Sequence, residues 1–119
     1  MSHAAIEIAS AEHFTEIVDS AGDLPVIIDF TASWCPPCQM IKPIYEQLAQ
    51  QYQGKAILVK IDVDERADLA QQFGIQAMPT FIAYVGKQVA ETMRGANKAG
   101  LEAMVAKYAK WLVWLKDIY

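Results

Sequence analysis

The fold is constrained most by residues 26–38, which read Val-Ile-Ile-Asp-Phe-Thr-Ala-Ser-Trp-Cys-Pro-Pro-Cys. The apolar run 26–30 is interrupted only by Asp29 and predicts a strand that is buried on both faces. After Cys35, apolar residues recur at helical spacing, at Met40, Ile41, Ile44, Tyr45 and Leu48. Cys35 is therefore expected where a strand ends and a helix begins. At that point the free amide groups and the helix dipole favour a thiolate.

Cys35 and Cys38 are the only cysteines of the chain, and their C-x-x-C spacing predicts dithiol–disulfide exchange. At a helix start, Cys35 would face outward as the nucleophile, and Cys38 would lie further in as the shielded resolving thiol. A metal site is the main alternative, but zinc needs about four ligands. The only histidines, His3 and His13, have no ligand spacing. A purely structural disulfide would add little stability, because it closes so small a loop.

The composition favours a small domain without disulfide staples. A chain of 119 residues suits one domain, and 54% hydrophobic residues supply an ordinary core. The net charge of −4 argues against a nucleic-acid partner. The N-terminus lacks the pattern of a signal peptide, and no apolar run reaches the roughly 20 residues of a membrane span. We therefore expect a soluble, cytoplasmic protein, and we interpret most Asp and Glu residues as a solvated surface.

The hydrophobic pattern predicts a β-α-β-α-β-α-β-β-α order, an α/β fold with a mixed five-stranded sheet flanked by four helices. A tight turn is expected at residues 86–87, and a kink is expected at Pro43 inside the second helix. Strands are expected at about residues 4–8, 26–30, 56–63, 80–85 and 88–93, and helix caps at Ser10, Asp64 and Asn97.

The segment from Asp29 to Cys38 resembles the active-site segment of the thioredoxins. The similarity extends from about Ile6 to Lys110 and includes Lys60-Ile61-Asp62-Val63-Asp64 and Met78-Pro79-Thr80. It implies the thioredoxin-like fold. Thioredoxins usually have Gly where this chain has Pro36, and the resulting Trp-Cys-Pro-Pro-Cys motif is shared with tryparedoxins.

Asp29 is the candidate acid–base group. A carboxylate in an apolar strand is costly to bury, so its pKa should rise towards neutrality. The resemblance implies that this carboxyl lies beneath the dithiol and exchanges a proton with Cys38, directly or through water. Lys60 matches a family lysine near that acid and would tune its electrostatics. Ordinary structural roles for Asp29 and Lys60 are the alternatives.

Several residues are expected to form the surface around the dithiol. Pro36 and Pro37 remove two amides that could have faced the Cys35 sulfur, which would favour a weaker oxidant. Trp34 precedes the nucleophile and would take part in docking. The resemblance implies a cis Met78–Pro79 bond, beside which the Met78 backbone would pair with an extended substrate peptide. The same comparison implies a third loop at Gly95 and Ala96, whose small side chains allow close approach of a substrate.

The last predicted helix continues past the end of the resemblance. We divide the chain into a thioredoxin domain at residues 1–110 and an apolar helical extension at residues 111–119. That extension would lengthen the helix by about 13 Å. It could pack against its own domain, form a homodimer or partner contact, lie on a membrane surface, or be foreign to the natural protein.

These observations predict a protein-disulfide reductase that binds no cofactor and works through a Cys35–Cys38 dithiol–disulfide cycle. The resemblance implies disulfide-containing client proteins and a separate reductase. One alternative is a tryparedoxin-like or glutathione-coupled carrier, suggested by Pro36. Others are a protein disulfide oxidase or isomerase, and an interaction module whose extension recruits a partner while the dithiol is regulatory.

Overall fold

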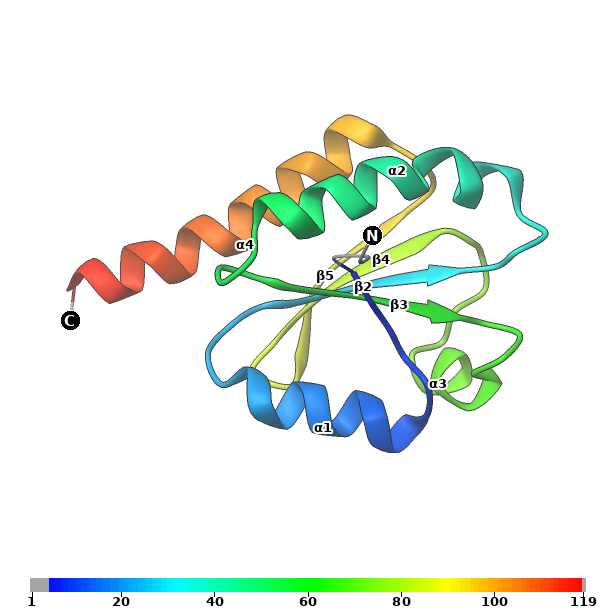
Figure 1. Ribbon diagram of the computed structural model, residues 1–119, viewed down its shortest axis with the longest axis horizontal. Helices are drawn as coiled ribbons and strands as arrows, with labels where there is room; N and C mark the ends of the chain where they lie inside the picture. The colour runs from blue at the N-terminus through cyan, green and yellow to red at the C-terminus, as the bar shows by residue number, and fades with distance from the viewer. Residues whose placement is uncertain (1–4, 119) are drawn as a thin grey trace.

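Five strands form one mixed sheet, and four helices cover its two faces (Figure 1). The computed structural model describes residues 5–118, with side chains up to residue 109. The strands are β1 (Ile6–Glu7), β2 (Val26–Thr31), β3 (Ile57–Asp62), β4 (Thr80–Val85) and β5 (Gln88–Arg94), and the helices are α1 (Ala11–Ala21), α2 (Pro36–Gln51), α3 (Ala67–Gln72) and α4 (Lys98–Ile118).

The sheet has the order β1-β3-β2-β4-β5, with β2 at its centre. Strands β1, β3 and β2 are parallel, whereas β4 runs antiparallel to β2, and β5 antiparallel to β4. All residues of the apolar run 26–30 are buried, as predicted, because the strand has a neighbour on each side and helices on each face. This is the expected thioredoxin-like architecture.

The two faces of the sheet hold separate cores. Helices α2 and α4 lie over one face and α1 and α3 over the other, as Figure 1 shows. Alternate residues of β2 point to opposite faces. Ile27 joins the core beneath α2 and α4, where Tyr45, Leu48 and Leu101 are also buried. Ile28 joins the core beneath α1 and α3. Asp29 therefore points towards α2, among apolar groups.

The predicted turn and two of the predicted caps are confirmed. Ser10 Oγ accepts a hydrogen bond from the His13 amide at 3.0 Å and caps α1. Asn97 Oδ1 accepts one from the Gly100 amide at 3.0 Å, at the start of α4. Gly86 and Lys87, both with positive φ, form the tight turn between β4 and β5.

Two local predictions are wrong. Asp64 does not cap α3, which begins after Arg66 without a side-chain cap. Instead, Asp62 Oδ1 accepts hydrogen bonds from the amides of Asp64 and Glu65 and closes the turn after β3. Met40 is not a core residue: it is 70% exposed, because it lies on the side of α2 that turns away from the sheet.

Helix α4 continues without a break from Lys98 to Ile118. Its last turns extend beyond the sheet, in red in Figure 1. The side chains of residues 110–119 lie outside those that the structure describes, so the possible contacts of the extension stay predictions. None of the described helices is both long and apolar enough to cross a membrane.

Candidate active site

The two cysteines lie at the start of α2 and are joined by a disulfide bond. Cys35 is the N-cap residue, and its Sγ accepts a hydrogen bond from the Cys38 amide at 3.3 Å. Pro36 and Pro37 occupy the first two helical positions, where an amide has no partner within the helix. The helix start thus directs one amide at the sulfur, as predicted from the two prolines.

Cys35 does not face outward in this oxidised state. Its exposed fraction is only 4%, close to the 2% of Cys38, so the predicted difference in exposure is wrong here. Both cysteines pack against Ala32 in a small buried cluster, which Met78 and Val63 partly cover. The Cys35 sulfur also lies 3.6 Å from the Met78 carbonyl oxygen. The loop before β4 therefore covers the dithiol.

That loop contains the predicted cis peptide bond between Met78 and Pro79. The Thr80 hydroxyl donates a hydrogen bond to the Ala77 carbonyl at 2.6 Å, and the Gly95 amide donates one to the Pro79 carbonyl at 2.9 Å. Gly95, with a φ of +96°, is thus hydrogen-bonded directly to the loop that contains Pro79. Ala96 packs instead against the core beneath α2 and α4. Contact of either residue with a substrate remains a prediction.

Trp34 is 63% exposed beside the dithiol. Its indole Nε1 donates a hydrogen bond to Asp64 Oδ2 at 2.7 Å, so the loop after β2 is tied to the turn after β3. This hydrogen bond fixes the position of an indole ring that is mostly exposed to solvent. The docking role of Trp34 stays a prediction, and the exposed indole suits it.

Asp29 is buried among apolar groups, with an exposed fraction of 6%. Its Oδ1 has no hydrogen-bond partner among the described residues. Burial raises the pKa of this carboxyl from 3.8 to about 7; the Lys60 charge opposes the rise and the Glu46 charge adds to it. The predicted direction is confirmed. The value suits a group that gains and loses a proton at neutral pH.

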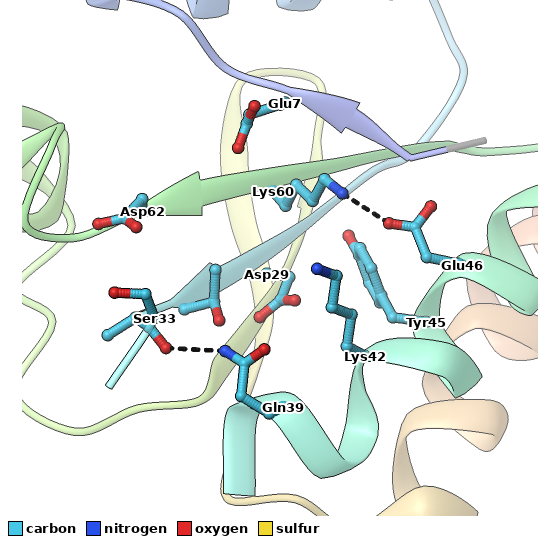
Figure 2. A pocket seen from close by; sticks show the side chains of 11 residues that line it. Glu7, Asp29, Ser33, Gln39, Lys42, Tyr45, Glu46, Lys60 and Asp62 are labelled. Atoms are coloured by element: carbon cyan, nitrogen blue, oxygen red, sulfur yellow. Dashed lines mark hydrogen bonds and ion pairs between the residues drawn. The ribbon is translucent and has the colours of Figure 1, made fainter. Parts of the chain in front are cut away.

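Lys60 lies next to Asp29 in the register of β3 and β2, but it forms its ion pair with another residue. Its Nζ lies 2.7 Å from Glu46 Oε2, and Figure 2 shows the lysine turned towards Glu46. Glu46 is not among the residues predicted from the sequence, because acidic residues on helices are usually part of a solvated surface. Its side chain is only 16% exposed. A lysine inside a half-buried strand is costly to bury unless an anion pairs with it. The position of Lys60 in the sequence could therefore have indicated an acidic partner.

A small cavity, lined mostly by polar and charged residues, connects these groups. Its volume is about 180 Å³, and Figure 2 shows the side chains around it. Ala32 lines the cavity and also packs against both cysteines, so the cavity extends from the charged pair to the surroundings of the dithiol. It is lined by Glu7, Asp29, Thr31, Ala32, Ser33, Gln39, Lys42, Tyr45, Glu46, Lys60 and Asp62.

The site combines a reversible disulfide, a buried carboxyl that titrates near neutrality and an exposed aromatic ring. Within the described part of the chain, no group of three or more His, Cys, Asp or Glu side chains could hold a metal ion. The chemistry that these groups support is the transfer of two electrons between dithiols and disulfides, coupled to proton transfer.

Comparisons with known proteins agree with this chemistry. The family model described as thioredoxin matches residues 5–107. Thioredoxin H4 of Arabidopsis thaliana is 48% identical over 83 residues, which cover 70% of each protein. A thioredoxin of Mus musculus is 41% identical over 102 residues, or 86% of this chain and 96% of the mouse protein. A solved thioredoxin of Nicotiana alata is 34% identical, covers 91% of this chain and 95% of its own, and superposes with a TM-score of 0.84. The similarity of the motif to tryparedoxins stays a prediction.

Proposed function

The chain belongs to the thioredoxin family, and on that basis we propose a role in thiol–disulfide exchange for each residue of the site. The protein reduces protein disulfides through the Cys35–Cys38 pair. The observation that carries this function is the disulfide at the start of α2, with one sulfur bonded to a helix amide and a titratable carboxyl in the strand that precedes it.

In the first step, the Cys35 thiolate attacks one sulfur of the substrate disulfide. A bond forms between Cys35 and that sulfur, the substrate disulfide breaks, and the second substrate sulfur leaves as a thiolate that takes up a proton. The Cys38 amide stabilises the attacking thiolate by a charge-assisted hydrogen bond.

In the second step, Cys38 gives its proton to the Asp29 carboxylate and attacks the Cys35 sulfur. The mixed disulfide breaks, the Cys35–Cys38 bond forms, and the remaining substrate sulfur leaves as a thiolate. Two electrons have then passed from the dithiol to the substrate. No cofactor enters either step. Lys60 acts on this step through the charge that it places near Asp29.

The substrate is held by the surface around the sulfurs. We assign docking to Trp34, Pro36 and Pro37, and pairing with an extended peptide to the loop 78–79. The loop 95–96 would border the same peptide, supported by the hydrogen bond from the Gly95 amide to the Pro79 carbonyl. The exposed indole and the covering position of Met78 support this assignment.

Thioredoxins act on disulfide-containing proteins and are restored by a separate reductase. For this chain we propose cytoplasmic clients such as peroxiredoxins, ribonucleotide reductase or methionine sulfoxide reductases. We also propose that residues 111–119 form a contact with a partner that is separate from the chemistry, because the family model ends at residue 107.

Trapping of the mixed disulfide tests the two cysteine roles. Reduced Cys38→Ser should accumulate a covalent complex with a disulfide-containing protein such as insulin, visible on a non-reducing gel. Reduced Cys35→Ser should form none and lose disulfide reduction by about 10³-fold or more. Complex formation by Cys35→Ser alone would reverse the two roles.

A further inference from the structure

Glu46 has a carboxylate that is held at both oxygens. Its Oε1 accepts a hydrogen bond from the Ala5 amide at 3.1 Å, and its Oε2 lies 2.7 Å from Lys60 Nζ. The side chains of Glu46 and Lys60 are only 16% and 15% exposed. A pair this far withdrawn from water and bonded on both sides is held in one geometry, unlike an exposed ion pair.

Three acidic residues surround Lys60: Glu46 on α2, and its register partners Asp29 on β2 and Glu7 on β1. Among the described residues, Lys60 forms an ion pair only with Glu46. Asp29 and Lys60 are register partners on adjacent parallel strands, so their side chains leave the same face of the sheet. Figure 2 shows the Lys60 ammonium directed to Glu46 on α2 and away from Asp29. Among the residues that the structure describes, Asp29 makes no ion pair, and its Oδ1 makes no hydrogen bond.

We propose that Glu46 is a positioning residue: by binding the Lys60 ammonium, it prevents Lys60 from pairing with Asp29 and so leaves that carboxyl available for proton exchange with Cys38. The proton exchange itself rests on the function proposed above. Among the described residues, Glu46 makes no hydrogen bond to either cysteine, and we assign its effect on Asp29 to Lys60 and to its own charge.

The electrostatics of the cavity support this arrangement. The Lys60 charge lowers the pKa of Asp29 and the Glu46 charge raises it, while burial supplies the largest effect. Without Glu46, the remaining acidic register partners of Lys60 are the exposed Glu7 and the buried Asp29. We expect the lysine to turn to Asp29, because water screens a buried charge less than an exposed one. The loss of the Glu46 charge and the approach of the Lys60 charge would each lower the pKa of Asp29. The other titratable groups that line the cavity are Glu7 of β1, Lys42 and Tyr45 of α2, and Asp62 of β3.

The variant Glu46→Gln distinguishes the positioning of Lys60 from a purely structural role of Glu46 at the Ala5 amide. The glutamine keeps an oxygen that can accept the hydrogen bond from the Ala5 amide, but it loses the charge that holds Lys60. Lys60→Gln and the double variant show whether Glu46 acts through the lysine. Glu91→Gln is the matched control, because Glu91 lies 3.0 Å from Lys107 in an ion pair outside the cavity.

The measurement is the titration midpoint of the Asp29 carboxyl, followed by carbon-13 NMR of the protein, together with the pH profile of disulfide reduction. Glu46→Gln should lower the midpoint by about one pH unit, and the matching limb of the rate profile should move with it. Lys60→Gln should raise the midpoint. Glu91→Gln should change neither quantity.

Two results would overturn the positioning role. One is an unchanged Asp29 midpoint in Glu46→Gln. The other is a fall of equal size whether or not Lys60 is present, since Glu46 would then act without the lysine. If instead the midpoint falls as expected while the rate profile stays in place, the link between Glu46, Lys60 and Asp29 stands. In that case the proposed proton transfer from Cys38 to Asp29 is wrong.

Discussion

At the scale of single residues, Asp29 lowers the free energy of unfolding by an amount that depends on pH. Its carboxyl has a pKa of about 7 in the folded chain and an ordinary value of 3.8. Below about pH 4 the carboxyl is protonated in the folded and the unfolded state, so it adds no pH dependence. Between about pH 4 and 7 the unfolded state releases the proton while the folded state keeps it. The free energy of unfolding therefore falls as pH rises, and the loss is complete above pH 7.

Asp29→Asn should remove this pH dependence. Each pKa unit corresponds to about 1.4 kcal/mol, so the variant should gain up to about 4 kcal/mol over the parent between pH 4 and pH 8. The measurement is the free energy of unfolding of the oxidised protein in urea at both pH values. A difference between variant and parent that does not change with pH would show that Asp29 is ionised or well solvated in the folded chain.

Residues differ in how far the sequence alone predicts their surroundings. Asp29 could be identified because a single acid in an apolar strand has few explanations. Glu46 could not, because its neighbours in α2 do not reveal that the helix contacts Ala5, just before β1, and Lys60 of β3. Such a contact depends on the packing of distant segments.

At the scale of elements, the start of α2 sets the stability of the Cys35 thiolate. An N-cap side chain accepts hydrogen bonds from the second or third helical amide. Here the third is Cys38, which donates to Cys35, and the second is Pro37, which has no amide hydrogen. The chain therefore provides one of the two usual donors.

Pro37→Ala should lower the pKa of the reduced Cys35 by about one unit, because it restores the second donor. The measurement is the rate of alkylation by iodoacetamide as a function of pH. Pro36→Ala is the control, since it restores an amide at the first helical position, which the cap does not normally bind. An equal or larger change in Pro36→Ala would contradict this explanation.

The elements themselves were predicted well where one strong local signal defines them. Ser10 and Asn97 cap helices as expected because each side chain reaches an amide three residues later. Asp64 is not a cap because α3 begins only after Arg66. Its carboxylate accepts the hydrogen bond from the Trp34 indole instead. Met40 failed as a core residue because its apolarity alone does not decide its side of the helix.

At the scale of the whole molecule, the chemistry and the extension are expected to be separable. Truncation after Lys110 should leave disulfide reduction within about twofold of the full chain, because both cysteines and the core residues that the structure describes precede the cut. Sedimentation or binding to a partner should change if the extension is a contact surface. A large loss of activity at unchanged stability would show instead that the extension takes part in docking or in the reaction.

The whole molecule is a reductant of protein disulfides. The measurement that tests it most directly is the reduction potential of the Cys35–Cys38 pair, obtained by equilibration against a thiol buffer and trapping of the free thiols. We predict a value near about −270 mV, as in thioredoxin. A value between about −120 and −180 mV would place the pair among oxidases and isomerases and would contradict the proposed direction of electron flow.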